Sequence, residues 1–183
     1  MELIGISGYA GSGKDTVADY YIENSRFARY SLADPIKKAA SEMFGVPLAH
    51  FSDRELKEVV IPFWGFSPRY MAQIIGTECG RNLFRQDIWI KRAEVEYNKY
   101  RDNFNAGGMV IPDIRFENEA VWIQKMGGTL IHITRPDYDG DVGTAGHASE
   151  AGYSDNLKDY TVINDGTIED LYEKINKILT GTL

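Results

Sequence analysis

The run Gly8-Tyr9-Ala10-Gly11-Ser12-Gly13-Lys14-Asp15-Thr16 has the composition of a loop that holds phosphate groups. Its glycines allow successive backbone N–H groups to turn toward an anion, and a helix expected to begin near Lys14 adds partial positive charge. Lys14 can reach the β- and γ-phosphates of a nucleoside triphosphate, and the hydroxyl of Thr16 can reach an α- or β-phosphate. These nine residues are therefore predicted to form a phosphate-binding loop; the alternative is a glycine-rich turn with a solvated lysine.

Two aspartates are candidate ligands for Mg²⁺. Asp15 stands where the general motif has Ser or Thr, and its carboxylate is a hard oxygen ligand for direct or water-mediated contact. It also brings a negative charge beside the phosphates. Asp113 ends an apolar strand, Met109 to Ile111, where α/β folds hold metal-bound water, although such a residue can equally cap the following helix.

Arginines are the second group of candidates, because a transferring phosphoryl group needs cations around it. Arg69 and Arg81 flank a helical segment that also carries Gln73 and Glu78. Arg115 follows Asp113 closely, and Arg135 begins a glycine-rich stretch that is either a closing lid or a plain surface loop.

Two further residues have competing interpretations. Asp34 follows the second predicted strand, where α/β folds bind ligands, and is otherwise an ordinary cap before Pro35. Trp89 can stack on a nucleobase, whereas helical aromatic residues more often belong to the core.

Alternating strands and helices must position these groups. Short apolar runs predict strands over Glu2 to Ser7, Phe27 to Leu32, Met109 to Ile111, Thr129 to Thr134 and Tyr160 to Ile163. Periodicity and capping signals predict helices from Lys14, over Pro35 to Phe44, from Ser52, from Pro68, over Asp87 to Phe104, after Asp113, and from Ile168 to Leu179. This order predicts an α/β fold with a mainly parallel sheet covered on both faces and a helical insertion after the second strand.

Composition limits the remaining options. A chain of 183 residues fits one domain over 1–183, with the insertion at about 45–105 and the lid at about 135–152. The net charge of −7 disfavours nucleic acid as a partner. The single cysteine, Cys79, excludes an intrachain disulfide and fits a reducing cytoplasm. No apolar stretch reaches the roughly 20 residues that span a bilayer, and the N-terminus does not resemble a signal peptide.

Several motifs in order resemble those of the phage-type deoxynucleoside monophosphate kinases, over nearly the whole chain. They are Gly8 to Thr16, Ala33-Asp34-Pro35, Gly76-Thr77-Glu78-Cys79-Gly80-Arg81, Trp89, Asp113 to Glu119, His147-Ala148-Ser149-Glu150 and Ile163-Asn164-Asp165-Gly166. The ending Gly-Lys-Asp-Thr is itself similar to this family's loop. The chain departs from the family at Cys79, where an aliphatic residue is expected, and at Glu117, where proline is common.

The resemblance implies a three-layer P-loop NTPase fold and Mg²⁺-dependent transfer of the ATP γ-phosphoryl group to a deoxynucleoside monophosphate. It implies that Gly8 to Thr16 hold the ATP phosphates and that the adenine lies near Asn164, Asp165 and Gly166. The implied catalytic residues are Lys14, Asp15, Arg115 and Arg135. The implied substrate site comprises Asp34, Arg69, Gln73, Glu78, Arg81, Trp89, Asp113, Arg115 and Glu150. The location would be the cytoplasm, of the host if the chain is phage-encoded.

Two other functions are compatible with the residues. A phosphate loop and a lid do not define the acceptor, so a kinase of dephospho-coenzyme A or phosphomevalonate stays an alternative. The second alternative is a nucleotide-binding protein without turnover, which would not need the arginines of the middle segment. The sequence also leaves assembly as a homodimer open.

Overall fold

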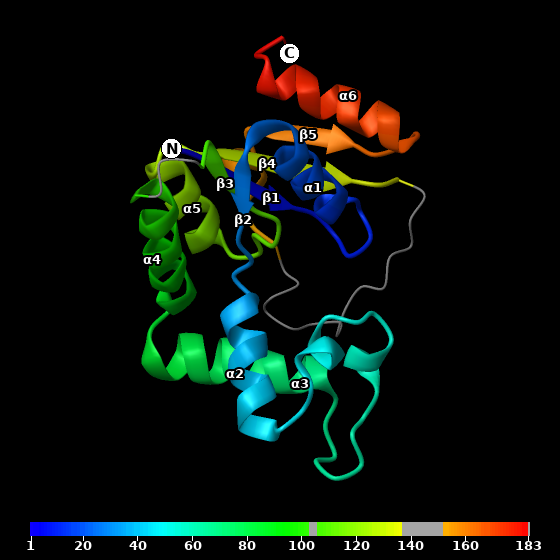
Figure 1. The fold of residues 1–183 in the computed structure, drawn as a ribbon, viewed down its shortest axis with the longest axis vertical. Helices are drawn as coiled ribbons and strands as arrows, with labels where there is room; N and C mark the ends of the chain where they lie inside the picture. The colour runs from blue at the N-terminus through cyan, green and yellow to red at the C-terminus, as the bar shows by residue number, and fades with distance from the viewer. Residues whose placement is uncertain (103–105, 137–151, 183) are drawn as a thin grey trace. The chain divides into compact units, whose positions relative to one another are not determined.

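The computed structural model describes residues 1–102, 106–136 and 152–182, which divide into two compact units (Figure 1). The sheet unit comprises Met1–Ser31 and Glu94–Leu183, and the helical unit comprises Leu32–Ala93. The predicted insertion at about 45–105 overlaps with the helical unit, which begins earlier and ends earlier. The predicted lid at about 135–152 lies mostly outside the described residues.

The sheet unit contains five strands, and every pairing between them is parallel. They are β1 (Glu2–Ser7), β2 (Phe27–Arg29), β3 (Gly108–Ile111), β4 (Thr129–Thr134) and β5 (Tyr160–Ile163), in the spatial order β2-β3-β1-β4-β5. The predicted parallel sheet is thus confirmed. Strand β2 ends at Arg29, three residues before the predicted Leu32, although the N–H of Tyr30 still donates to the carbonyl oxygen of Val110 in β3 at 3.0 Å.

Helices cover both faces of this sheet. On one face, α1 (Lys14–Ser25) and α6 (Ile168–Leu179) place Val17, Ala18, Tyr21, Leu171, Ile175 and Ile178 in one buried cluster with Ile4, Val110 and Ile131 of the strands. On the other, Ile123 of α5 (Glu117–Lys125) lies against Gly5 of β1. The alternation of side chains along each strand supplies apolar residues to both faces, which gives the predicted three layers.

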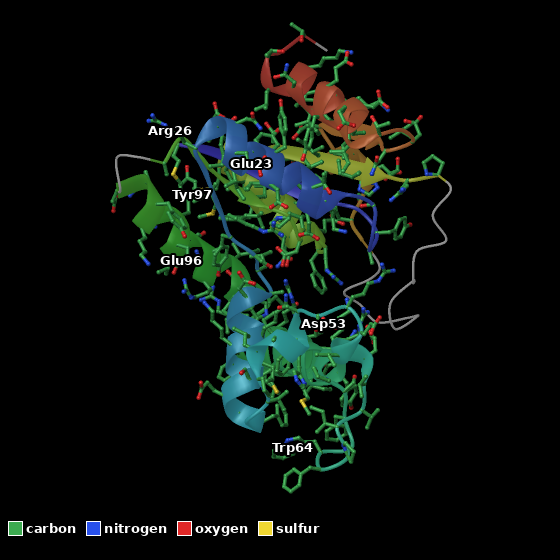
Figure 2. All side chains as sticks on the ribbon, turned by 45° about the vertical axis from the view of Figure 1, so that its right-hand side comes forward. Glu23, Arg26, Asp53, Trp64, Glu96 and Tyr97 are labelled. Atoms are coloured by element: carbon green, nitrogen blue, oxygen red, sulfur yellow. The ribbon has the colours of Figure 1, made fainter. Side chains whose placement is uncertain are left out.

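Helix α4 (Ile88–Asp102) begins in the helical unit and ends in the sheet unit. Within the sheet unit, the hydroxyl of Tyr97 donates a hydrogen bond of 2.8 Å to the carbonyl oxygen of Met1; Figure 2 labels Tyr97 on this helix. This contact anchors the start of the chain. None of the helices in the described part of the chain is long and apolar enough to cross a membrane.

The helical unit is built around α2 (Asp34–Phe44), α3 (Pro68–Gln73) and the π-helix η3 (Ile74–Phe84), with short 3₁₀ turns at η1 (Leu48–Phe51) and η2 (Leu56–Glu58). Its own core consists of Ala40, Val46, Phe51, Met71 and Ile75. Helix α3 begins as predicted, with the hydroxyl of Ser67 accepting from the N–H of Tyr70 at 3.3 Å.

The helix predicted from Ser52 is wrong. Asp53, labelled in Figure 2, accepts through Oδ1 from the N–H groups of Glu55 and Leu56, both at 2.9 Å. This closes a local turn and is followed only by the three residues of η2. After η2, a bridge between Ile61 and Phe66 folds the chain back on itself.

Candidate functional site

The phosphate loop connects β1 to α1 and needs its glycines for two reasons. Gly8 has φ +140°, and a Cβ atom there would lie 2.2 Å from the carbonyl oxygen of Ile133 in β4. Gly13 has φ +107°, and a Cβ atom would lie 2.7 Å from the amide nitrogen of Asn164. Only a residue without a side chain permits this backbone conformation and these close approaches.

Asn164 holds the loop from the end of β5. Its side-chain amide donates to the carbonyl oxygen of Ser12 at 2.9 Å, and its backbone N–H donates to Thr134 at 2.7 Å. Within the loop, Lys14 Nζ donates to the carbonyl oxygen of Tyr9 at 2.6 Å. Asn164 was predicted near the adenine, and the structure adds a contact that fixes the loop's shape.

A cavity of about 390 Å³ opens at this loop. Eight of its ten lining residues are predicted site residues: Gly11, Gly13, Lys14, Asp15, Thr16, Arg135, Asn164 and Gly166. The other two, Ile168 and Leu171 of α6, were predicted only as part of that helix's apolar stripe. Ile168 remains 56% exposed, so it offers the cavity an apolar wall of the kind that a flat base needs.

Asp165, predicted beside the adenine, forms an ion pair with Lys174 at 2.6 Å. The hydrogen bond from Lys174 lowers the pKa of the Asp165 carboxyl below its usual range. Its carboxylate is therefore held toward α6.

Asp113 follows β3, beside the central strand that leads into the phosphate loop. Its carboxylate accepts from the hydroxyl of Ser31 at 2.6 Å, and the next residue, Ile114, donates from its N–H to Ile6 of β1 at 3.1 Å. Helix α5 has Phe116 as its N-cap, so the alternative role of Asp113 as a cap is wrong. Asp113 lies at the carboxyl edge of the sheet, as its position in the sequence predicted.

A buried carboxylate that the sequence did not single out supports the turn with Asp113 and Arg115. Glu119 is 2% exposed, and its Oε2 accepts from the N–H groups of Arg115 at 2.8 Å and Phe116 at 2.9 Å. A glutamate three residues after the N-cap is the signal that could have identified it.

Asp15 forms an ion pair with an arginine that was not among the predicted site residues. Arg29, the last residue of β2, forms ion pairs with Asp15 and, at 2.8 Å, with Asp19. The predicted metal ligand in the loop is thus partnered by an arginine. No sequence motif marks Arg29, which comes to α1 through the pairing of β2 with β3.

A buried hydrogen-bond network lies next to the phosphate loop, around the last residue of β1. The hydroxyl of Ser7, directly before Gly8, is 2.9 Å from His132 Nδ1 and 2.7 Å from the hydroxyl of Tyr153. Burial, together with the charge of Lys158, lowers the pKa of His132 to about 4. Burial also raises the pKa of Tyr153. At neutral pH these side chains form an uncharged hydrogen-bonded cluster between β1 and β4.

The predicted acceptor residues of the helical unit make contacts within that unit. Arg69 pairs with Glu58 at 2.6 Å, and Arg81, only 5% exposed, donates to the carbonyl oxygen of Gln86 at 2.9 Å. The indole N–H of Trp89 donates to Gly76 at 2.7 Å. Arg81 and Gly76 both belong to η3, and π-helical segments occur frequently at functional sites.

Four other residues were predicted in the substrate site. Asp34 is the first residue of α2, and the N-cap is Ala33, so Asp34 is not that helix's cap. Gln73 ends α3, and Glu78 lies within η3. Glu150 lies outside the described residues.

The parallel sheet, with a glycine-rich loop that leads from β1 into α1, defines a three-layer α/β P-loop fold. The fold is similar to that of TT1252 from Thermus thermophilus, with a TM-score of 0.56, 18% identity and coverage of 100% of this chain and 98% of that one. It is also similar to a sugar kinase from Janibacter sp. HTCC2649, with a TM-score of 0.51, 12% identity and coverage of 98% and 95%.

Sequence comparison identifies the family within that class. The profile of the deoxynucleotide monophosphate kinases matches residues 2–61 and 48–175. The chain is 35% identical over 186 residues to a protein of Acanthamoeba polyphaga mimivirus, covering 96% of this chain and 94% of that protein. It is 28% identical over 244 residues to the deoxynucleotide monophosphate kinase of Enterobacteria phage T4, covering 98% and 99%. The chain belongs to the deoxynucleotide monophosphate kinase family, and is thus an ATP-dependent phosphotransferase.

Proposed function

We propose that the protein transfers the γ-phosphoryl group of ATP to a deoxynucleoside 5′-monophosphate, giving a deoxynucleoside diphosphate and ADP. The observation that carries this proposal is the cavity at the phosphate loop, where Lys14 and Thr16, Arg135, and Asn164 come together from three separate parts of a chain of this family. The substrate is a small molecule, and the net charge of −7 disfavours nucleic acid.

On the donor side, the N–H groups of the loop and Lys14 would hold the β- and γ-phosphates, and the segment Asn164 to Gly166 would contact the adenine. Lys14 would exchange its bond to Tyr9 for a phosphate oxygen, since an ammonium group gains more from an anion than from a neutral carbonyl. Arg115 and Arg135 would stabilise the charge on the transferring phosphoryl group.

The donor set at the loop fits Mg²⁺. The carboxylates of Asp15 and Asp113 and the hydroxyl of Thr16 are hard oxygen ligands. No group of three or more His, Cys, Asp or Glu side chains among the described residues is arranged to hold an ion alone. This suits Mg²⁺ that enters with the phosphates and takes only one or two protein carboxylates. When bound, the ion would neutralise charge on the β- and γ-phosphates.

On the acceptor side, Arg69 and Arg81 would bind the monophosphate, with Asp34, Gln73, Glu78, Trp89 and Glu150 around the nucleoside and Asp113 close to the acceptor. The attacking oxygen already belongs to an anionic phosphate, so no general base is required. Positioning and neutralisation of charge would therefore supply most of the catalysis.

The test is a coupled assay of ADP release with MgATP against all deoxy- and ribonucleoside monophosphates. Dephospho-coenzyme A and phosphomevalonate serve as controls for the other acceptor class. Turnover with one or more deoxynucleotides is the expected result. ADP release only with a control acceptor would move the chain to another kinase activity, and ATP binding without any product would favour a protein that does not catalyse transfer. The cytoplasmic location and the assembly as a homodimer stay predictions.

A further inference from the structure

The segment that leaves β2 contacts both carboxylates predicted to meet the metal. Arg29 pairs with Asp15, and Ser31, two residues later, donates to Asp113 at 2.6 Å. The backbone here is fixed by the sheet, since Arg29 is in register with Val110 of β3 and the N–H of Tyr30 donates to Val110 at 3.0 Å. The Arg29 guanidinium therefore reaches the first turn of α1 from a rigid base.

The Arg29 ion pairs contribute little to folding. The side chains of Asp15 and Asp19 are 77% and 54% exposed, and that of Arg29 is 35% exposed. Exposed ion pairs of this kind contribute little to stability, because water and salt screen them. Their effect on the charge of the site is larger, because Asp15 also lines the cavity at the loop.

A carboxylate in that cavity opposes the binding of a polyphosphate. Asp15 and Asp19 lie four residues apart on one face of α1, so their negative charges repel each other as well as any bound phosphate. Arg29 binds both and adds a positive charge beside them. It also holds Asp15 Oδ1 toward β2.

We propose that Arg29 is a positioning residue of the donor site, which neutralises Asp15 and holds its carboxylate in place so that the loop accepts the ATP phosphates. This inference rests on the proposed function. It predicts that the contribution of Arg29 to ATP affinity depends on the charge of Asp15. It also favours Asp113 over Asp15 as the direct carboxylate ligand of Mg²⁺.

The experiment measures ATP binding by calorimetry in wild type and in the variants Arg29→Gln, Asp15→Asn and the double variant, each with Mg²⁺ and with EDTA. We expect Arg29→Gln to weaken ATP binding about tenfold, because it exposes the Asp15 charge to the phosphates. Asp15→Asn in the same chain should restore the affinity to within about threefold of wild type. Asp19→Asn is the matched control, since it removes a partner of Arg29 that does not line the cavity, and should change the affinity less than about twofold.

Arg29→Lys tests charge separately from geometry. It keeps the positive charge and should weaken binding less than Arg29→Gln does. Thermal unfolding of each variant checks folding, and only small shifts are expected from exposed pairs.

Two results would overturn the proposal. One is a failure of Asp15→Asn to rescue Arg29→Gln, which would mean that Arg29 acts independently of Asp15. The other is a loss of affinity in Asp15→Asn that occurs with Mg²⁺ and not with EDTA, which would make Asp15 a direct metal ligand. A wild-type chain that binds no ATP would instead remove the proposed function itself.

Discussion

The sheet unit and the helical unit assemble their polar residues in opposite ways. In the sheet unit, the cavity is lined by residues that follow three different strands: the loop after β1, Arg135 after β4 and Asn164 after β5. In the helical unit, most predicted acceptor residues lie within the single stretch 69–89. Arg69, Arg81 and Trp89 are bound there to Glu58, Gln86 and Gly76 of the same unit.

This difference shows how each unit holds its candidate residues. A parallel sheet brings strand ends together at one edge, so residues that are far apart in the sequence converge there. A continuous helical stretch can orient its polar groups only through nearby side chains and carbonyls. We therefore expect substitutions in the sheet unit to act on ATP, and those in the helical unit to act on the acceptor and on that unit's own stability.

The largest expected effect is on the donor side. Lys14→Met should lower kcat by about 10²–10³, because it removes a cation from the developing charge on the phosphates. The melting temperature should hardly change, since Lys14, the first residue of α1, is not part of the buried core. Steady-state kinetics and a thermal melt on the same preparation measure both. An unaltered kcat would mean that the cavity is not the donor site.

The next largest effect is on stability, when alanine replaces a glycine with positive φ. Two such glycines, one from each unit, allow a comparison. Gly8→Ala should destabilise the protein by about 2–4 kcal/mol, because the new Cβ would meet the Ile133 carbonyl as well as strain the backbone. Gly65 in the helical unit has φ +69° and open space around it, so Gly65→Ala should cost only about 1 kcal/mol. Urea unfolding measures the free energy of unfolding of both variants. Equal losses of stability would show that the close approach of Gly8 to β4 does not contribute.

Arg81→Ala probes the helical unit. We expect the KM for the deoxynucleotide to rise about 10- to 100-fold while ATP affinity changes far less, because the lost group would bind the acceptor phosphate. Stability should also fall by about 1–3 kcal/mol, since the buried Arg81 guanidinium and its charge-assisted hydrogen bond to the carbonyl oxygen of Gln86 are lost. Arg85→Ala is the control, because Arg85 is an exposed arginine of the same unit that pairs with Asp87. Equal weakening of ATP and acceptor would place Arg81 outside the acceptor site.

The smallest effect is a pH dependence from His132. Its pKa is about 4 in the folded chain and 6.5 when unfolded, so as the pH falls the unfolded chain takes up a proton before the folded chain does. Stability should therefore decline between pH 6.5 and about 4, by about 1–2 kcal/mol for a side chain that is only partly buried. Urea unfolding across this range should show the decline in wild type and in His50→Gln, but not in His132→Gln. A decline that persists in His132→Gln would assign it to other groups.

Local patterns predicted much of this molecule. The glycine run, the apolar strands and the periodicity of the C-terminal helix each lie within a few neighbouring residues, and all three recur in the structure. The wrongly predicted helix from Ser52 also has a local cause. The side chain of Asp53, and not that of Ser52, accepts from the N–H groups of Glu55 and Leu56, and the capping pattern does not say which of the two side chains will accept.

By itself, then, the sequence determined the phosphate loop, the alternation of strands and helices, and the family. Only the tertiary structure decided that Arg29 meets Asp15, that Ser31 meets Asp113, and that Ser7, His132 and Tyr153 form one cluster. These contacts join residues 14, 82, 125 and 146 positions apart. They exist because β1 lies between β3 and β4 and β2 lies beside β3, an order set by how the whole core packs and not by any local run of residues.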